Sequence, residues 1–269
     1  MTSTRDNPGA FKASSPPAVR TIASRTTRLL REREYRTAAF GLLVDAINLI
    51  EARAGSAMPK HFHCSCCGYE AHAFRHIFSS GKLVWNSACP ACDSRSRHRG
   101  LAVLLPRLLD EYQPRRVLHF APEPVLRRYF ERANVAYETA DLHLDDATHT
   151  GIDLQRLPFR ESSYDFVVCN HVLEHIPNDG AALAEIARTL SPGGVAVLTV
   201  PGDFTRAETV SFTGELPNGH YRDYGLDLIP RLKGVFTRVQ ALDMHLLDSK
   251  NGTLSYGIRK RDLAFVCDR

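Results

Sequence analysis

The sequence predicts an α/β fold in which a doubly wound, mostly parallel sheet follows a small cysteine-rich element. Two observations lead to this fold class. After Pro114, short apolar runs alternate with segments of helical periodicity, as in buried parallel strands that are joined by crossover helices. Before Pro114, five of the seven cysteines lie between positions 64 and 92. Such clustering is typical of a metal site and not of a disulfide framework.

Length and composition fit a globular protein. The 269 residues suffice for one large domain, or for a medium domain with an appendage. The hydrophobic share of 43% and the charged share of 24% exclude a disordered, collagen-like or coiled-coil chain. The longest apolar run, 38–50, is interrupted by Asp45 and Asn48 and is too short to cross a bilayer, so no membrane span is predicted. Without a secretory signal core, the expected compartment is reducing and cytoplasmic, with an organelle transit peptide as the alternative.

The positive charge is concentrated at the N-terminus. Residues 1–36 contain eight bases and three acids, a net charge of +5, whereas the whole chain carries +4. The remaining chain is therefore close to neutral, at −1. Because binding to phosphates needs a basic face on the folded part, this distribution disfavours a nucleic-acid partner.

Four segments are expected along the chain. Residues 1–26 lack periodicity and are expected to form a disordered basic tail. Over 27–56, apolar residues recur at helical spacing, which predicts one long amphipathic helix, either a packing helix or a lid or partner-binding helix. Residues 57–95 are expected to form a zinc-ribbon-like element. Residues 96–269 form the α/β domain, which begins with a helix at 96–112.

Strands and helices alternate along the α/β domain. The expected strands lie at 116–121, 136–141, 151–159, 164–171, 195–201, 236–244 and 263–268. The expected helices lie at 125–133, 180–190 and 226–232. The run Ser191–Gly194 is expected to be a turn.

The cysteines form two CxxC pairs that are separated by 21 residues. The pairs are Cys64 with Cys67, and Cys89 with Cys92. Each pair can form a tight knuckle, so the two together offer four thiolates to one tetrahedral Zn²⁺. Cys66 can replace a member of the first pair, and His61 and His63 are reserve ligands. Four thiolates leave no open position on the metal, so the zinc is expected to be structural.

In a doubly wound sheet, the ligand lies at the carboxyl ends of the strands, where the strand order reverses. The loop after the first strand, Ala121–Pro124, stands where nucleotide-binding folds often carry glycines. Asp141 ends the second strand, and its carboxylate can accept hydrogen bonds from a ribose diol. Asp153, by the third strand, can hold an adenine amino group. Either acid can also be an ordinary turn or N-cap residue.

Four runs together resemble the class I S-adenosylmethionine-dependent methyltransferases, most closely the branch called type 11. They are GIDLQRLPF at 151–159, SYDF at 163–166, CNHVLEHI at 169–176 and LSPGG at 190–194. The sequence CPAC at 89–92 with RHR at 97–99 is similar to zinc-ribbon-bearing members of that group. The resemblance covers residues 114–205 closely. It implies a Rossmann-like methyltransferase domain, S-adenosylmethionine as cofactor and methyltransferase activity.

The resemblance also implies which residues bind the cofactor. These are Phe120, Ala121, Pro122, Asp141, Leu142, Asp153, Leu154 and Asn170. The family's ExGxG motif is altered, because His119 replaces the acid and Ala121 and Glu123 replace the glycines. Glu123 can pair with the cofactor's α-ammonium, and Arg97, or one of its neighbours Arg95 and Arg99, can hold the carboxylate.

Candidate catalytic residues follow the fourth and fifth strands. His171 ends the fourth strand, and His220 lies in the segment PNGHYRDYG at 217–225, whose other polar residues include Arg222 and Tyr224. Histidine titrates in the range of a base that works near neutral pH. Equally, Asn218 and Gly219 are typical of a surface turn.

The expected function is methylation of a small molecule, on a hydroxyl or carboxyl group of a metabolite or sugar. An alternative is an RNA methyltransferase that uses the zinc ribbon and the basic arm. A third hypothesis is a non-catalytic binding module, because the first loop lacks glycines. The sequence does not determine the acceptor atom or the oligomeric state.

Overall fold

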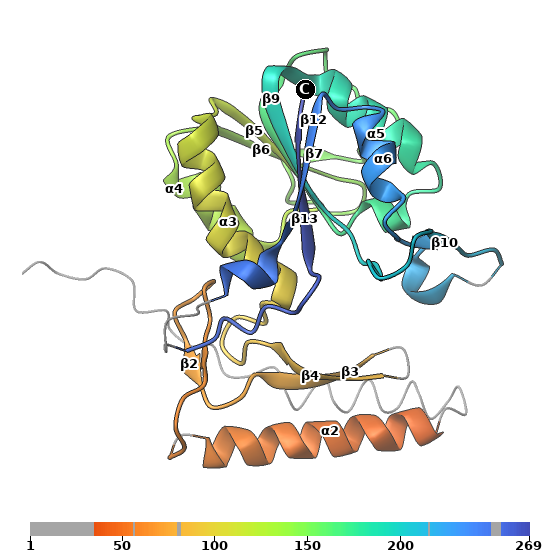
Figure 1. The fold of residues 1–269 in the computed structure, drawn as a ribbon. Helices are drawn as coiled ribbons and strands as arrows, with labels where there is room; N and C mark the ends of the chain where they lie inside the picture. Colours follow the sequence, from red (N-terminus) through yellow and green to blue (C-terminus); the bar gives the residue numbers. More distant parts are fainter. Residues whose placement is uncertain (1–34, 56, 80–81, 215, 249–253) are drawn as a thin grey trace, which may run out of the picture.

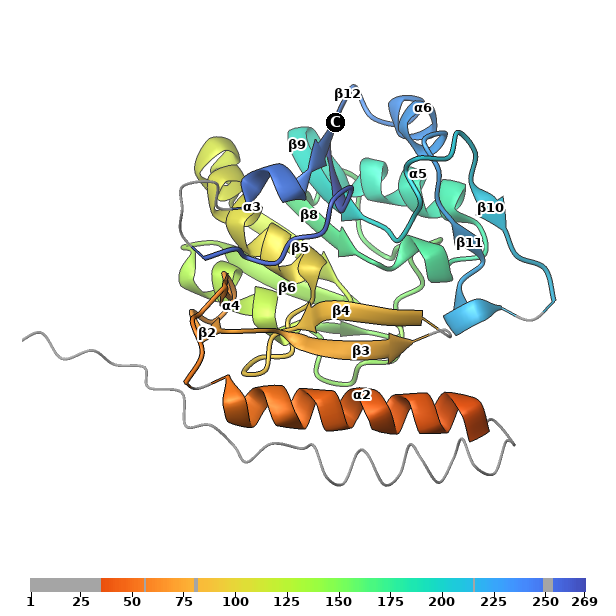
Figure 2. The same ribbon diagram turned by 60° about the horizontal axis from the view of Figure 1, so that its bottom comes forward.

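The computed structural model describes residues 35–55, 57–79, 82–214, 216–248 and 254–269. The expected tail at 1–26 and the beginning of the expected N-terminal helix lie outside these residues. Within them, a twisted central sheet carries helices on both faces, and a hairpin with one long helix lies beyond one end of the sheet (Figures 1 and 2).

The central sheet has seven strands in the order β12-β13-β9-β8-β5-β6-β7. Their bounds are β5 Arg116–Phe120, β6 Ala136–Asp141, β7 His149–Thr150, β8 Tyr164–Asn170, β9 Leu190–Thr199, β12 Arg238–Asp243 and β13 Leu263–Asp268. Only β13 runs antiparallel to its neighbours, β12 and β9. The strand order changes direction between β5 and β8, which pair in parallel. The predicted doubly wound, mostly parallel sheet is confirmed.

Both faces of the sheet are buried, which explains the continuous apolar runs of its strands. Val117, Phe166 and Val168 pack in one core with helices α3 (Ser96–Tyr112) and α4 (Pro124–Arg132). Leu118 and Val167 pack in a second core with helices α5 (Asp179–Thr189) and α6 (Leu228–Lys233). Figure 1 shows the two pairs of helices on opposite sides of the sheet.

Two of the expected elements differ. The strand expected at 151–159 is wrong: the strand is β7, which ends at Thr150, and the following residues form turns. There the Asp153 carboxylate accepts a hydrogen bond from the Gln155 amide at 2.9 Å, and this local bond competes with strand pairing. The run Ser191–Gly194, expected as a turn, is part of the irregular beginning of β9.

The helix expected near the N-terminus is present as α2 (Tyr35–Ala54), but it does not bury the expected face. Phe40 and Ile50 are 46% and 66% exposed, whereas Ala38 and Val44 are buried. The helix lies along the hairpin of β3 (Arg75–Ser79) and β4 (Lys82–Ala88) (Figures 1 and 2). The Asn48 side chain joins them, donating to the His76 carbonyl at 2.9 Å and accepting from the His76 amide at 2.7 Å.

The remaining elements are short. They are β1 Phe62–His63, β2 Glu70–Ala71, β10 Val210–Ser211, β11 Arg222–Asp223, and the 3₁₀ turns η1 Leu173–His175, η2 Pro217–Gly219 and η3 Met244–Leu247. None of the helices in the described part of the chain has the length and apolar character that crossing a bilayer requires.

Candidate functional site

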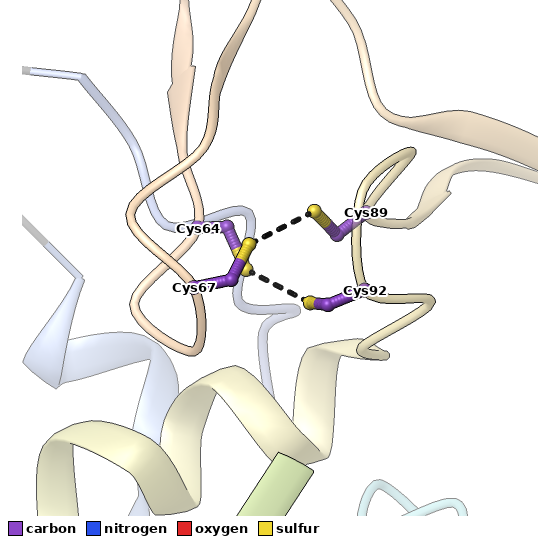
Figure 3. Close-up of side chains that lie close together, drawn as sticks. All are labelled: Cys64, Cys67, Cys89 and Cys92. Atoms are coloured by element: carbon purple, nitrogen blue, oxygen red, sulfur yellow. Dashed lines mark hydrogen bonds between the residues drawn. The ribbon is translucent and has the colours of Figure 1, made fainter. Parts of the chain in front are cut away.

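The four predicted cysteine ligands meet in one cluster (Figure 3). The Cys64 and Cys92 sulfurs are 3.7 Å apart, as are those of Cys67 and Cys89. Zn–S bonds of about 2.3 Å in a tetrahedron separate the sulfurs by about 3.8 Å, so the cluster fits a tetrahedral zinc. Gly68 has a φ of +77°, which allows the chain to turn back so that its amide donates to the Cys64 carbonyl at 2.8 Å.

The reserve ligands take no part in the cluster. Cys66 is 1% exposed and packs with Phe74 and Ala102. His63 faces Glu70, with Nδ1 3.7 Å from Oε1, and the His61 ring lies against that of His72. The cysteine cluster therefore consists of the two CxxC pairs alone.

The predicted cofactor loop begins where β5 ends. Phe120, which is 3% exposed, pairs with Ala140 of β6 on one side and with Cys169 of β8 on the other. The next residue, Ala121, has a φ of +46°, which is the left-handed region that glycine adopts more easily. Its amide donates to the Ala140 carbonyl at 2.9 Å. The chain therefore makes a left-handed turn at this point although an alanine stands there.

Both predicted acids organise turns, Asp141 at the carboxyl end of β6 and Asp153 shortly after β7. One Asp141 oxygen accepts from the amides of His143 and Leu144 at 2.6 and 2.8 Å, and the Asp141 carbonyl accepts from the Ile152 amide at 3.0 Å. This last bond brings the segment of Asp153 next to the end of β6. Asp153 is exposed and is bonded to Gln155.

The other predicted residues of the loops differ in exposure. Leu142 is 51% exposed, beside the buried Leu154 at 3%. Pro122 is also buried, and Glu123 is partly buried.

Glu123 has partners within the protein. Its carboxylate accepts a hydrogen bond from the Asn170 amide group and lies 3.3 Å from His98 Nε2 and 3.4 Å from His119 Nε2. The Arg95 amide donates to His98 Nδ1 at 3.2 Å, so the ring hydrogen is on Nε2 and faces Glu123. The sequence did not indicate this cluster, because its members come from α3, β5, the loop after β5 and β8.

Electrostatics keep Glu123 ionised. Burial alone would raise the pKa of this carboxyl, but the adjacent imidazoles of His119 and His98 lower the pKa to about 2. Burial lowers the pKa of His98, although the nearby Glu123 opposes this shift. Asn170 accepts a hydrogen bond from the Thr199 hydroxyl while it donates to Glu123, so its orientation is fixed.

The structure separates the three candidate arginines. Arg99 is fully buried, and its guanidinium donates to the carbonyls of Ser94, Tyr256 and Gly257 at 2.5, 2.6 and 2.8 Å. Arg99 therefore joins α3 to the cysteine element and to the C-terminal segment.

The other two arginines have different surroundings. Arg95 pairs with Asp93 at 3.8 Å. Arg97 Nε is buried and has no hydrogen-bond partner among the described residues. Arg97 also lies close enough to His171 for its charge to lower the pKa of that ring. Arg97 is therefore the arginine that is free to hold an anion beside the end of β8.

The two predicted catalytic histidines border a buried acid. His171 follows β8 with a φ of +53°, and its Nδ1 lies 3.3 Å from Glu174 Oε1. His175 Nε2 lies 3.9 Å from the same oxygen, and the His175 ring packs edge-on against that of His220 at 4.8 Å between centroids. Burial, with a smaller contribution from Arg97, lowers the pKa of His171 to about 3, and burial also lowers the pKa of His220.

Arg222 and Tyr224, considered above as possible acceptor contacts, are structural. Arg222 donates to the carbonyls of Leu173, Ile176 and Pro177 at 3.0, 2.7 and 2.7 Å. Tyr224 is fully buried and donates to Asp179 at 2.9 Å. Arg222 therefore fixes the segment of His220 against η1.

Comparison with known proteins adds a family match and several structural likenesses. Residues 112–198, 87 of the 269, match a family model described as a methyltransferase domain. Among solved structures, the Burkholderia thailandensis 1,6-didemethyltoxoflavin-N1-methyltransferase is 15% identical, with a TM-score of 0.43 over 72% of this chain and 98% of that chain. The [4+2]-cyclase SpnF is 16% identical, with a TM-score of 0.36 over 53% and 60%. The Haemonchus contortus phosphoethanolamine N-methyltransferase 2 is 17% identical, with a TM-score of 0.38 over 55% and 39%.

The chain thus spans less than two thirds of the length of the last two proteins, and the structural likenesses are too weak to carry a function. The family match is independent of them and lies over β5 to β9, the strands whose ends hold Ala121, Asp141 and Asn170. Residues 112–198 of this chain therefore match a methyltransferase domain, and they lie in a sheet with the doubly wound strand order.

Proposed function

We propose that the protein is an S-adenosylmethionine-dependent methyltransferase whose acceptor is a small molecule that carries a hydroxyl or carboxyl group. One observation carries the proposal. Ala121, Asp141 and Asn170 follow adjacent parallel strands at the point where the strand order reverses, which is where doubly wound sheets bind their ligands. The family match covers the same strands.

The side chains around this point suit the chemistry of the cofactor. Arg97, with its buried and unpaired Nε, can hold the carboxylate of the methionine portion. Asp141 is fixed by two backbone amides at the end of β6, where it can accept hydrogen bonds from a ribose. Leu142, which follows Asp141 and is 51% exposed, offers apolar surface for an adenine ring, whereas Leu154 lies buried in the core beneath the loops.

Glu123 has a different role from the one the sequence suggested. Its carboxylate already accepts from Asn170 and contacts two histidines. We therefore assign it the task of holding the loop after β5 against the end of β8. An α-ammonium group can still approach the carboxylate, which is 18% exposed.

Bound S-adenosylmethionine supplies an already activated methyl group, so this chain mainly has to orient the acceptor and exclude water. His171 and His220 stand on the acceptor side, beyond the end of β8. The segment of His220 is held by Arg222 and by the Tyr221 amide, which donates to the Glu174 carbonyl at 2.7 Å. Both histidines are therefore positioned to contact an acceptor.

The charge of the acceptor-side segment favours a small acceptor over RNA. Residues 202–227 contain five acids and two bases, a net charge of −3. Both bases are engaged within the protein: Arg206 pairs with Asp223 at 2.6 Å, and Arg222 lies 3.6 Å from Asp179. A segment of this charge repels a phosphate backbone.

The cysteine cluster supports a structural zinc, bound by Cys64, Cys67, Cys89 and Cys92. The second knuckle leads directly into α3, the helix that carries Arg97 and His98. A metal there fixes the start of this helix and thereby the position of Arg97 beside the cofactor site.

Calorimetric titration with S-adenosylmethionine tests the cofactor assignment. We expect binding to the wild-type protein and at least tenfold weaker binding to the Arg97→Met and Asp141→Ala variants, because each loses a charge-assisted hydrogen bond. Asp145→Ala, an exposed acid in the same loop, is the matched control and should bind like the wild type. No binding to folded, zinc-loaded wild type would refute the proposal and leave a non-catalytic binding module.

Incubation with radiolabelled cofactor and fractionated cell extract tests the acceptor class. Label in the small-metabolite fraction supports the proposal. Label only in RNA would replace it by the RNA methyltransferase hypothesis.

A further inference from the structure

We propose that Glu174, His175 and His220 form a second metal site, which binds a divalent transition-metal ion through one carboxylate oxygen and two imidazole nitrogens. The site lies on the acceptor side and is separate from the cysteine cluster. One ligand atom from each of the three residues lies within 4.8 Å of the other two. No cysteine belongs to the group, so its chemistry differs from that of the structural zinc site.

The distances approach those of a bound ion. Oxygen and nitrogen ligands about 2.1 Å from one metal are about 3 to 4 Å apart. The distance of 3.9 Å between Glu174 Oε1 and His175 Nε2 already lies in this range. The His175 side chain is 45% exposed and that of His220 is partly exposed, so small ring rotations can close the wider separations.

Glu174 is the strongest indication that the group can hold a cation. Its side chain is 1% exposed, and Oε2 has no hydrogen-bond partner among the described residues. A buried carboxylate without a compensating partner is costly, and no arginine or lysine contacts it in the described part of the chain. A divalent cation between Glu174 and the histidines would compensate this charge.

The tautomer of His175 supports the same conclusion. His175 Nδ1 lies 3.1 Å from the Gly219 carbonyl, which can only accept a hydrogen bond, so Nδ1 carries the hydrogen. In the neutral ring, Nε2 then carries the lone pair, and it lies 3.9 Å from Glu174 Oε1. Metal-binding histidines are usually held in this way, with the other ring nitrogen donating to a carbonyl or carboxylate.

The backbone around the ligands is pre-arranged. Glu174 and His175 lie in η1, and His220 follows η2. The Tyr221 amide bonds to the Glu174 carbonyl at 2.7 Å, and Arg222 bonds to three carbonyls around η1. Ligands that are held on a fixed scaffold bind a metal without an added ordering cost.

The site adjoins the proposed methyl-transfer centre through His171, whose Nδ1 is 3.3 Å from Glu174. A metal ion there can bind an acceptor oxygen and lower the pKa of its hydroxyl. This use of the site rests on the proposed function, and it would make His220 a ligand in place of a base. The metal site itself does not depend on it.

Cobalt titration of zinc-loaded protein tests the site. We expect one further equivalent of Co²⁺ with weak d–d absorption and no thiolate charge-transfer band, since its ligands are oxygen and nitrogen. Glu174→Gln and His220→Ala should each bind this equivalent at least tenfold more weakly. His143→Ala, an exposed histidine elsewhere, is the control and should keep it.

Two results would overturn the proposal: a wild-type protein without the second equivalent, or unchanged binding in folded Glu174→Gln and His220→Ala. Circular dichroism checks the fold of each variant. Because His220→Ala removes only a partly exposed ring, this variant keeps the test valid if Glu174→Gln is unstable. Calorimetry with S-adenosylmethionine on the same samples separates the two hypotheses. Cobalt binding without cofactor binding would refute the proposed function and support the metal site. Cofactor binding without cobalt binding would support the proposed function and refute the metal site.

Discussion

Replacing Glu123 by Gln should lower the free energy of unfolding and reduce the dependence of that free energy on pH below about pH 5. The carboxylate is 18% exposed and accepts a hydrogen bond from Asn170. Burial raises its pKa, but the adjacent imidazoles of His119 and His98 outweigh this and lower the pKa to about 2 from the ordinary 4.5. At 1.36 kcal/mol per pH unit, this difference corresponds to about 3 kcal/mol of stability. Glutamine keeps the size of the side chain but cannot carry the charge.

The sign of the pH dependence follows from the lowered pKa. A carboxyl whose pKa is lower in the folded state stabilises that state above its ordinary pKa, and this stabilisation is lost as the pH falls from about 5 to 2. The stability difference between wild type and Glu123→Gln should therefore be about 3 kcal/mol at pH 7 and about 1 kcal/mol at pH 3. Acidification also releases zinc from thiolates, but both proteins lose it equally, so the difference isolates Glu123.

Urea unfolding at pH 7, 5 and 3 measures this difference, with tryptophan fluorescence and circular dichroism as independent probes. Glu131→Gln, an exposed acid on the same helix α4, is the matched control and should remain within about 0.5 kcal/mol of the wild type at each pH. A wild type and a Glu123→Gln variant whose stabilities differ by the same amount at pH 7 and pH 3 would refute the reasoning.

Two further predictions concern the loop after β5 and the cysteine cluster. Ala121→Gly should stabilise the protein by about 0.5–1 kcal/mol, because removing the strain of an alanine with positive φ gains more than the added entropy of the unfolded glycine chain costs. The melting temperature should then rise by about 2 °C, and a lower melting temperature would contradict this prediction. Cys89→Ser should release the zinc and destabilise the fold by several kcal/mol. Metal analysis checks the loss of zinc, and urea unfolding checks the loss of stability. If the wild-type protein contained no zinc and removing metal did not change its stability, the cluster would not be a zinc site.

The sheet was predictable from the sequence because its strands are buried on both faces. The runs that became β5, β8 and the second half of β9 are short and apolar, and crossover helices separate them, so pattern alone indicates their place. The third strand was misplaced because side-chain bonds of Asp153 to the Gln155 backbone override the local β tendency. The buried face of α2 depends on the hairpin it contacts, which periodicity does not reveal.

The site was only partly predictable. The spacing of the CxxC pairs identified the cysteine cluster, because a knuckle is a local structure. The choice among Arg95, Arg97 and Arg99 required the tertiary structure, since the C-terminal carbonyls that bind Arg99 are more than 150 residues away. Likewise, the cofactor positions at Asp141, Asp153 and Asn170 stay predictions, because proximity to the ends of the strands does not demonstrate binding.

Two departures from local backbone preference lie at the proposed cofactor site. Ala121 and His171 both have a positive φ, and they follow β5 and β8, the two neighbouring strands between which the order reverses. Left-handed non-glycine residues persist only where their surroundings hold them. Here the Asn170 side chain, bonded to Thr199 and Glu123, joins the two strand ends and thereby holds both turns. The cluster of Glu123 with Asn170 and the two histidines therefore holds the loop after β5 in a turn for which glycine is ordinarily better suited.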